Sequence, residues 1–152
     1  MKPKIIIIDI DGTIANIDHR KHLIMQDSPK WDEFYKACVG DTPIPENIKL
    51  IKDDLEAMTA QPVFVTGRSD IVKDETDNWL IEHFFGGKVY PYTMHMRAAG
   101  DHREDFEVKK EVCEEALAED EIVRAYDDRP QVIRMYKDRG LDIVDLGPGV
   151  DF

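Results

Sequence analysis

The stretch IIIIDIDGT near the start of the chain constrains the fold more than any other part of the sequence. Four consecutive isoleucines, Ile5 to Ile8, form a β-branched run. Such a run, bounded by a turn, predicts a strand buried on both faces of a parallel sheet. Asp9 and Asp11 follow at once, before Gly12 breaks the run. Ligands of open α/β sheets bind at the carboxyl ends of the strands, so the two acids are candidates for chemistry.

Further apolar runs alternate with segments of helical periodicity along the chain. Strands are expected at Ile5–Ile8, Pro62–Val65, Lys88–Tyr92, Ile122–Tyr126 and Leu141–Leu146. Helices are expected at Pro45–Met58, Ile71–Phe85, Asp105–Leu117 and Pro130–Arg139. Strands alternating with helices of this length predict parallel βαβ units. We therefore expect an α/β fold with a doubly wound, Rossmann-like parallel sheet, in a single domain over residues 1–152.

Residues 14–45 do not follow this alternation. They separate the first strand from the next helix by more residues than ordinary βα loops contain, so we expect a small cap-like insert after the first strand. A short helix is expected near Trp31–Cys38, where the spacing of the apolar residues is helical. Its apolar face either packs on the main domain, which is the commoner case, or offers a platform on which nucleobases stack.

The composition bounds the class of protein. Hydrophobic residues make up 42% and charged residues 34% of the chain, as in ordinary globular domains. The isoleucine run is too short for a signal peptide or a membrane span, so we expect a cytoplasmic protein with no membrane association. Cys38 and Cys113 lack metal-ligand spacing and are expected to be buried, reduced thiols.

The net charge of -12 excludes a protein that coats nucleic acid, because that kind of binding depends on many lysine and arginine contacts to phosphates. Any contact with nucleic acid must therefore be local.

Asp9 and Asp11 lie one residue apart, so both can flank one reacting group. A calcium loop of the EF-hand type is excluded, because it needs glycine at its sixth position and glutamate at its twelfth. Counted from Asp9, those positions hold Ile14 and Arg20. The remaining alternative is that the two acids only cap a turn.

Two later motifs offer groups that bind an anion. The sequence TGRS, which begins at Thr66, directly follows the apolar run PVFV. The hydroxyl of Thr66 and the backbone N–H groups of a flexible turn can donate hydrogen bonds to a phosphate at that position. A Thr-Gly turn is also common at the end of a strand without any ligand. The helix opening EDFEVKKEV carries Lys109 and Lys110, which project about 100° apart, so only one of them faces a site. Otherwise both are solvated surface lysines.

A second pair of acids ends a later strand, in the sequence AYDDRP. Together with the acids after the first strand, this pair forms a cluster of like charges that is unfavourable unless a cation neutralises it. A hard divalent ion with oxygen ligands removes the repulsion, and we expect it to be Mg²⁺. The expected metal ligands are Asp9, Asp11, Asp127 and Asp128.

These motifs resemble, in the same order, the four motifs of the haloacid dehalogenase superfamily of phosphohydrolases: Asp9 with Asp11, Thr66, Lys109, and Asp127 with Asp128. The second aspartate is similar to that of the phosphatase branch. A closer resemblance is to the 3'-phosphatase domain of phage-type polynucleotide kinase-phosphatases. It is carried by DIDGTIA, VTGRS, RAAGDHREDFEVKKE, and DDRPQV through the terminal DF.

The resemblance implies residues that bind the phosphate and shape the substrate site, with Lys109 rather than Lys110 as the phosphate-binding lysine. These residues are Thr66, Gly67, Arg68, Lys109, Arg20, Arg97 and Asp105. Arg20, Arg68 and Arg97 are expected to converge at the entrance of the substrate site, where they can bind phosphate bidentately. The alternative is that each forms a salt bridge with one of the many acids.

The expected activity is that of a magnesium-dependent phosphomonoesterase that removes a terminal 3'-phosphate from a nucleic-acid end or a 3'-nucleotide. Asp9 is the expected nucleophile and forms an aspartyl phosphate, while Asp11 acts as general acid and base. One alternative is a phosphatase for free 5'-nucleotides or another small metabolite, and another is a non-catalytic nucleic-acid repair adaptor. No G-x-x-x-x-G-K-[ST] sequence occurs, so a kinase or ligase is expected as a separate partner.

Overall fold

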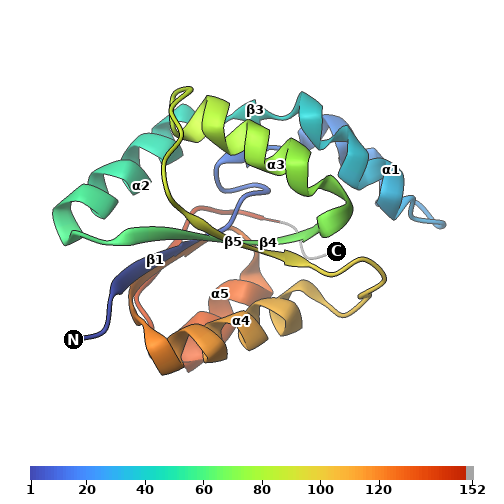
Figure 1. Cartoon of the computed structure of the whole chain (residues 1–152). Helices are drawn as coiled ribbons and strands as arrows, with labels where there is room; N and C mark the ends of the chain where they lie inside the picture. The colour runs from blue at the N-terminus through green and yellow to red at the C-terminus, as the bar shows by residue number, and fades with distance from the viewer. Residues whose placement is uncertain (150–152) are drawn as a thin grey trace.

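The computed structural model describes residues 1–149 as an α/β fold built on a five-stranded sheet (Figure 1). The strand order is β5-β4-β1-β6-β7. These strands are β1 (Lys4–Ile8), β4 (Gln61–Ser69), β5 (Thr93–Arg97), β6 (Glu121–Asp127) and β7 (Ile143–Asp145). All neighbouring strands pair in parallel, with β1 in the centre. The predicted doubly wound parallel sheet is therefore confirmed.

Helices cover both faces of this sheet, as Figure 1 shows. The helices are α2 (Pro45–Met58) and α3 (Lys73–Trp79) on one face, and α4 (Asp105–Glu119) and α5 (Pro130–Asp138) on the other. The bounds of α2 are those predicted, since proline opens the helix and Thr59 ends it in the left-handed conformation. Within the described residues 1–149, every helix is too short or too polar to cross a membrane.

The isoleucine run of β1 is buried on both faces, and this burial accounts for its composition. Ile6 and Ile8 pack with Phe64 in the core under α2 and α3, while Ile5 and Ile7 pack in the core under α4 and α5. All four isoleucines are at most 4% exposed. Each such side chain contributes roughly 1.5–3 kcal/mol when fully buried, so β1 anchors the sheet from both sides.

The strand expected at Lys88–Tyr92 is wrong, because the chain there is irregular and β5 begins at Thr93. Pro91 cannot donate a hydrogen bond to a neighbouring strand. Val89 and Tyr90 are exposed rather than buried in a sheet. The true strand, TMHMR, carries little of the β-branched signal on which the prediction depended.

The helix expected at Ile71–Phe85 is divided into three parts. A short 3₁₀ helix, η3 (Asp70–Val72), precedes α3, and a π-helical turn, η4 (Leu80–Phe84), follows it. The helical spacing was therefore present over most of the range, but the hydrogen-bond pattern changes twice along it. The buried residues Trp79, Leu80 and Phe84 show why the segment is apolar, since they pack on the sheet.

Between β1 and α2, the segment expected as an insert forms its own short elements. The strands β2 (Ala15–Asn16) and β3 (Thr42–Pro43) pair antiparallel and bring its two ends together. Between them lie the helices η1 (Asp18–Leu23), α1 (Trp31–Lys36) and η2 (Ala37–Gly40). Phe34, Tyr35 and Cys38 form a small core with residues of η1 and η3. Cys38 and Cys113 are buried free thiols, as predicted.

The aromatic cluster around Phe64 on β4 yields a test of the fold. The ring of Phe64 lies edge-to-face against Phe84, at 5.2 Å between centroids, and against Tyr92, at 5.5 Å. Because Phe64 is fully buried, Phe64→Ala is expected to lower the free energy of unfolding by about 3–5 kcal/mol in urea denaturation. Val89→Ala, at an exposed position, is the control and should change it by less than about 0.5 kcal/mol. Equal small effects would contradict the described core.

Candidate active site

The polar residues predicted from the sequence meet where β1, β4 and β6 end. In the register of the sheet, Ile8 of β1 lies level with Phe64 of β4 and Tyr126 of β6. The residues that follow on these strands therefore emerge at one edge. Parallel strands place their carboxyl ends together, which is why motifs more than fifty residues apart in the sequence form one site.

Three carboxylates at this edge form a group that can hold a metal ion. Asp9, Asp127 and Asp128 each offer an oxygen, and these oxygens lie within 4.8 Å of one another. Thr13 ties the group together, since its hydroxyl donates to Asp9 Oδ2 at 2.8 Å and to Asp128 Oδ1 at 3.4 Å. Gly12 is required beside it, because its φ is +83° and a Cβ there would lie 2.1 Å from Asp128 Oδ2.

Charge in this group is incompletely compensated. Burial raises the pKa of Asp127 and of Asp128, and the nearby Asp9 carboxylate raises both further. Such shifts arise when like charges are crowded together, and a divalent cation removes them. An all-oxygen donor set of this kind fits Mg²⁺, so the residues present suit the expected ion.

Asp11, expected among the metal ligands, does not join this group. Its Oδ1 instead accepts hydrogen bonds from Arg20 Nη2, at 2.8 Å, and from Arg68 Nε, at 2.9 Å. Burial alone would raise the pKa of Asp11, but the two guanidinium groups lower it to about 2. The side chain of Asp11 is thus held as an anion by arginines, and the sequence prediction of metal ligation by this side chain is not supported.

Lys109 is the cation at the centre of the acid group. Its Nζ donates to Asp9 Oδ1 at 2.8 Å and to Asp127 Oδ2 at 2.7 Å, and lies 3.3 Å from Asp105 Oδ2. Burial would lower the pKa of Lys109, but the three acids raise it, so the lysine stays charged while only 1% exposed. The neighbouring Lys110 is exposed, so one lysine of the pair faces the site, as their spacing predicts.

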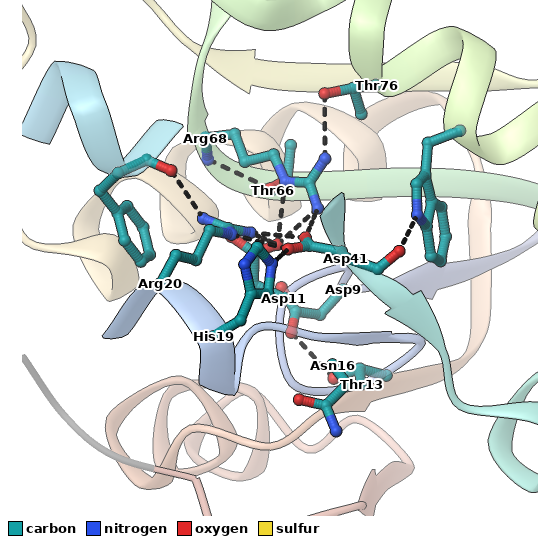
Figure 2. A network of polar contacts seen from close by, with 12 residues as sticks. Asp9, Asp11, Thr13, Asn16, His19, Arg20, Asp41, Thr66, Arg68 and Thr76 are labelled. Carbon is teal, nitrogen blue, oxygen red and sulfur yellow. Dashed lines mark hydrogen bonds and ion pairs between the residues drawn. The ribbon is translucent and has the colours of Figure 1, made fainter. Parts of the chain in front are cut away.

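A second buried network surrounds Asp11, and Figure 2 shows its residues converging. Asp41 accepts hydrogen bonds from Arg20 at 2.7 and 2.8 Å and from Arg68 at 2.8 Å. His19 lies 2.7 Å from the same carboxylate. Two acids and two arginines therefore bind one another, and both arginines are 0% exposed. Desolvation is tolerated here because each charge has partners at hydrogen-bond distance.

Asp41 was not expected from the sequence. It lies in the insert, in the sequence VGDTP, where an aspartate is ordinary turn chemistry. Its partner Arg20 is in the same insert, but Arg68 is on β4, so the pairing depends on the fold. The sequence held one indirect indication of Asp41: two arginines expected at the same site require more negative charge than Asp11 alone provides.

A pocket of about 210 Å³ opens beside these networks. Asp9, Asp11 and Asp128 line one part of it, and Arg97 and Arg129 line another. Five expected site residues lie behind this surface and do not line it: Arg20, Thr66, Arg68, Lys109 and Asp127. All five are at most 1% exposed. In this structure the guanidinium groups of Arg20 and Arg68 pair with Asp11 and Asp41 instead of lining the pocket, so phosphate binding by these two arginines stays a prediction.

The remaining predicted residues shape the pocket from β4, β5 and α4. Gly67 faces Asp105, since a Cβ at residue 67 would lie 2.2 Å from Asp105 Oδ1. Arg97 at the end of β5 donates to Gly67 O at 2.9 Å and to Asp101 O at 3.1 Å, so it joins β4 to the loop before α4. Thr66 Oγ1 accepts from the Arg68 backbone N–H at 3.1 Å. These contacts make the strand ends rigid.

Arg129 also lines the pocket, although the sequence motifs did not identify it as a site residue. It follows Asp128 directly, and its Nη1 lies 3.4 Å from Asp105 Oδ2. Asp105 is thus contacted by Lys109, Arg97 and Arg129, and these cations lower its pKa against the effect of burial. Its place in the run DDRP beside the acids was the signal that could have identified Arg129.

The strand order and the acids at the strand ends define a phosphatase of the haloacid dehalogenase type. Residues 3–152 match the family described as the polynucleotide kinase PNKP phosphatase domain, and the chain belongs to this family. Family membership favours an enzyme over a non-catalytic adaptor. The terminal DF of the resemblance lies outside the described residues.

Individual relatives agree with this assignment. A putative bifunctional polynucleotide kinase/RNA ligase of Autographa californica nuclear polyhedrosis virus is 26% identical over 137 residues. That match covers 90% of this chain but 18% of the relative, so the chain spans less than a fifth of the relative's length.

Solved structures share the fold. Two structures of Pnkp1/Rnl/Hen1 complexes match at 22% identity with TM-scores of 0.75 and 0.79. These matches cover 96% and 99% of this chain, and 43% and 48% of the other chains. A class C acid phosphatase from Bacillus anthracis with tungstate bound matches with a TM-score of 0.64 at 14% identity, over 95% of this chain and 66% of its own.

The buried network predicts a large cost for removing the charge of Asp41. Asp41→Asn keeps the shape of the side chain but leaves Arg20 and Arg68 without half of their negative charge. Removing one partner of a buried ion pair costs about 3–5 kcal/mol, and we expect urea denaturation to give a loss of that size. The matched control is Asp53→Asn, because Asp53 is exposed and pairs with Lys49 at the surface. The control should change stability by less than about 0.5 kcal/mol, and similar results for both variants would contradict the network.

Proposed function

We propose that the chain is a Mg²⁺-dependent phosphomonoesterase that removes a terminal 3'-phosphate from a nucleic-acid end or a 3'-nucleotide. The observation that carries the proposal is the fixed position of Asp9. Lys109 holds its Oδ1 at 2.8 Å, and Thr13 holds its Oδ2 at 2.8 Å, at the wall of the pocket. A carboxylate fixed by both oxygens beside further acids suits a nucleophile more than a turn cap.

In the proposed first step, an oxygen of Asp9 attacks the phosphorus in line with the leaving oxygen. The bond from phosphorus to the leaving alcohol breaks, and the phosphoryl group becomes an aspartyl phosphate on Asp9. In the second step, water attacks the phosphorus and restores the carboxylate. Dividing the hydrolysis in this way replaces one difficult displacement with two easier ones.

Asp11 is the proposed general acid and base of these steps. The described residues donate hydrogen bonds to its Oδ1, so Oδ2 is the oxygen available to accept or donate a proton. Arg20 and Arg68 favour the anion, which suits the step in which water is deprotonated. A bound phosphate dianion beside Asp11 raises its pKa by like-charge repulsion and so promotes the protonated form that the first step needs.

Asp9, Asp127 and Asp128 are the proposed ligands of Mg²⁺, since each offers an oxygen to one shared site. Hydrogen bonds to Asp127 from Lys109 and from the backbone of Asp128 and Arg129 orient its carboxylate. The chemistry that the ion supplies is neutralisation of the acids against an incoming phosphate and orientation of its oxygens. Lys109 shares the neutralisation of Asp9.

Arg97 is the proposed contact for the phosphate or its neighbour on the substrate. Unlike Arg20 and Arg68, Arg97 lines the pocket, and its side chain is 10% exposed. The backbone carbonyl groups that it contacts fix its orientation. A positioned guanidinium provides local anion binding in a protein whose net charge is -12.

The nucleic-acid substrate is supported by the family and by what its relatives are called. Those relatives are a putative polynucleotide kinase/RNA ligase and chains of an RNA repair complex, and both are longer than this chain. We propose a role in nucleic-acid end repair, with kinase and ligase activities supplied by separate partners or segments. A phosphatase for 5'-nucleotides or small metabolites is the alternative.

The proposed metal site predicts that activity depends on a divalent ion. Chelation with EDTA is expected to stop phosphate release from p-nitrophenyl phosphate, and added Mg²⁺ is expected to restore it. Asp128→Ala should raise the Mg²⁺ concentration for half-maximal rate at least about tenfold, the scale of losing a metal ligand. Asp138→Ala, a surface change on α5, is the control and should leave that concentration unchanged. Full activity after chelation would contradict the proposed metal site.

The proposed function also predicts which terminal phosphate of the substrate is removed. Rates on matched oligonucleotides with a 3'-phosphate or a 5'-phosphate should favour the 3'-phosphate. Arg97→Ala should lower the rate by at least about 100-fold, because it removes both anion binding and the bond to Gly67. Arg139→Ala is the control, since Arg139 pairs with Glu114 away from the pocket. A clear preference for 5'-phosphates would leave a phosphatase with the alternative substrate.

A further inference from the structure

The pocket beside Asp9 is lined by two chemically different groups of residues. Asp9 and Asp11 supply carboxylates, and α1 supplies the aromatic residues Trp31, Phe34 and Tyr35. The pocket has a volume of about 210 Å³. A ligand that extends from the acids along this pocket therefore meets an aromatic surface.

The three aromatic residues of α1 are not equivalent. Phe34 is 3% and Tyr35 is 9% exposed, and both belong to the small core of the insert. Trp31, at the first residue of the helix, is 36% exposed. Its ring lies edge-on to Phe34, at 5.9 Å and 86°, and near Tyr35, at 6.0 Å. Packing in this small core thus accounts for Phe34 and Tyr35, whereas Trp31 is partly exposed and lines the pocket.

The helix that carries Trp31 is fixed relative to the catalytic acids. The guanidinium carbon of Arg20 lies 4.3 Å from the centre of the Phe34 ring, and Arg20 Nη1 donates to Phe34 O at 3.3 Å. The same guanidinium group binds Asp11 at 2.8 Å. One arginine therefore links the aromatic helix α1 to Asp11. A platform held in this way is positioned for a ligand that reaches both.

We propose that the indole of Trp31 stacks on the base of the terminal nucleotide while its phosphate lies at Asp9. This inference rests on the proposed function and adds the residue that recognises the nucleoside part of the substrate. A nucleotide is a phosphate joined to a flat aromatic group, which matches a pocket lined both by polar residues and by aromatic rings. Stacking tolerates any base and needs no positive charge, so it suits a protein of net charge -12.

The test compares two oligonucleotides that differ only at the 3'-terminal residue. Both end in a 3'-phosphate, but one has a base at that residue and the other is abasic. Trp31→Ala is expected to lower kcat/KM on the base-bearing substrate by roughly 10- to 100-fold, the scale on which base–aromatic stacking acts, chiefly through KM. On the abasic substrate, the same variant should match the parent protein.

Two further variants distinguish a loss of base stacking from a general disturbance of the insert. Trp31→Phe keeps an aromatic face and should retain most of the kcat/KM on the base-bearing substrate. Val39→Ala changes another exposed residue of the insert, 66% exposed, and should have no effect on either substrate. Equal losses on both substrates in Trp31→Ala, or no loss on either, would overturn the stacking proposal.

Equilibrium binding distinguishes failure of this inference from failure of the proposed function. A nucleoside 3'-monophosphate should quench the tryptophan fluorescence of the parent protein but not that of Trp31→Phe, whose remaining Trp79 is 4% exposed. Quenching without turnover of 3'-phosphates would overturn the function and support the platform. Turnover with identical quenching in both proteins would support the function and overturn the platform.

Discussion

The buried contact between Asp11, Arg20, Asp41 and Arg68 is the interaction on which the rest of the site depends. It connects three parts of the chain: the turn after β1, the insert, and the end of β4. A buried guanidinium group without a partner is strongly unfavourable, so each arginine requires both acids. Through these pairs the insert is held over the sheet, where its helix α1 lines the pocket.

Lys109 has the corresponding role on the other side of the pocket. It brings Asp9, Asp105 and Asp127 together from β1, α4 and β6, which would otherwise repel one another. The two networks divide the acids of the site by function. Asp11 is neutralised by arginines and stays separate from the acids that suit a metal ion. Asp9 lies next to Lys109 at the wall of the pocket, which is where the proposed nucleophile must be.

The sequence was most informative where a residue pattern reports directly on local burial or on strand ends. Ile5–Ile8 predicted a strand buried on both faces, because alternate residues of a strand point to opposite sides. Asp127 was expected near Asp9 because parallel strands end at one edge. Both inferences use a single element or the simplest rule of sheet topology.

The sequence was least informative where a residue depends on its partners in space. Asp41 has no local signature, since its role arises from arginines on η1 and β4. Arg20 and Arg68 both contact Asp11, but whether they face solvent or buried acids depends on the position of the insert, which the sequence does not reveal. Strand β5 was misplaced because its sequence, TMHMR, has weak strand propensity and takes its structure from pairing with β4.

Direct trapping of the phosphorylated residue tests the central claim, that Asp9 is the nucleophile. Asp11→Asn protein is mixed with radiolabelled p-nitrophenyl phosphate, whose leaving group needs little protonation, so the first step proceeds while the second, which needs a general base, should be slow. The protein is then quenched in acid and mapped by peptide digestion. We predict label on the peptide that contains Asp9, and none in the double variant that also carries Asp9→Asn. Label on another residue, or release of phosphate by that double variant at an undiminished rate, would contradict the account.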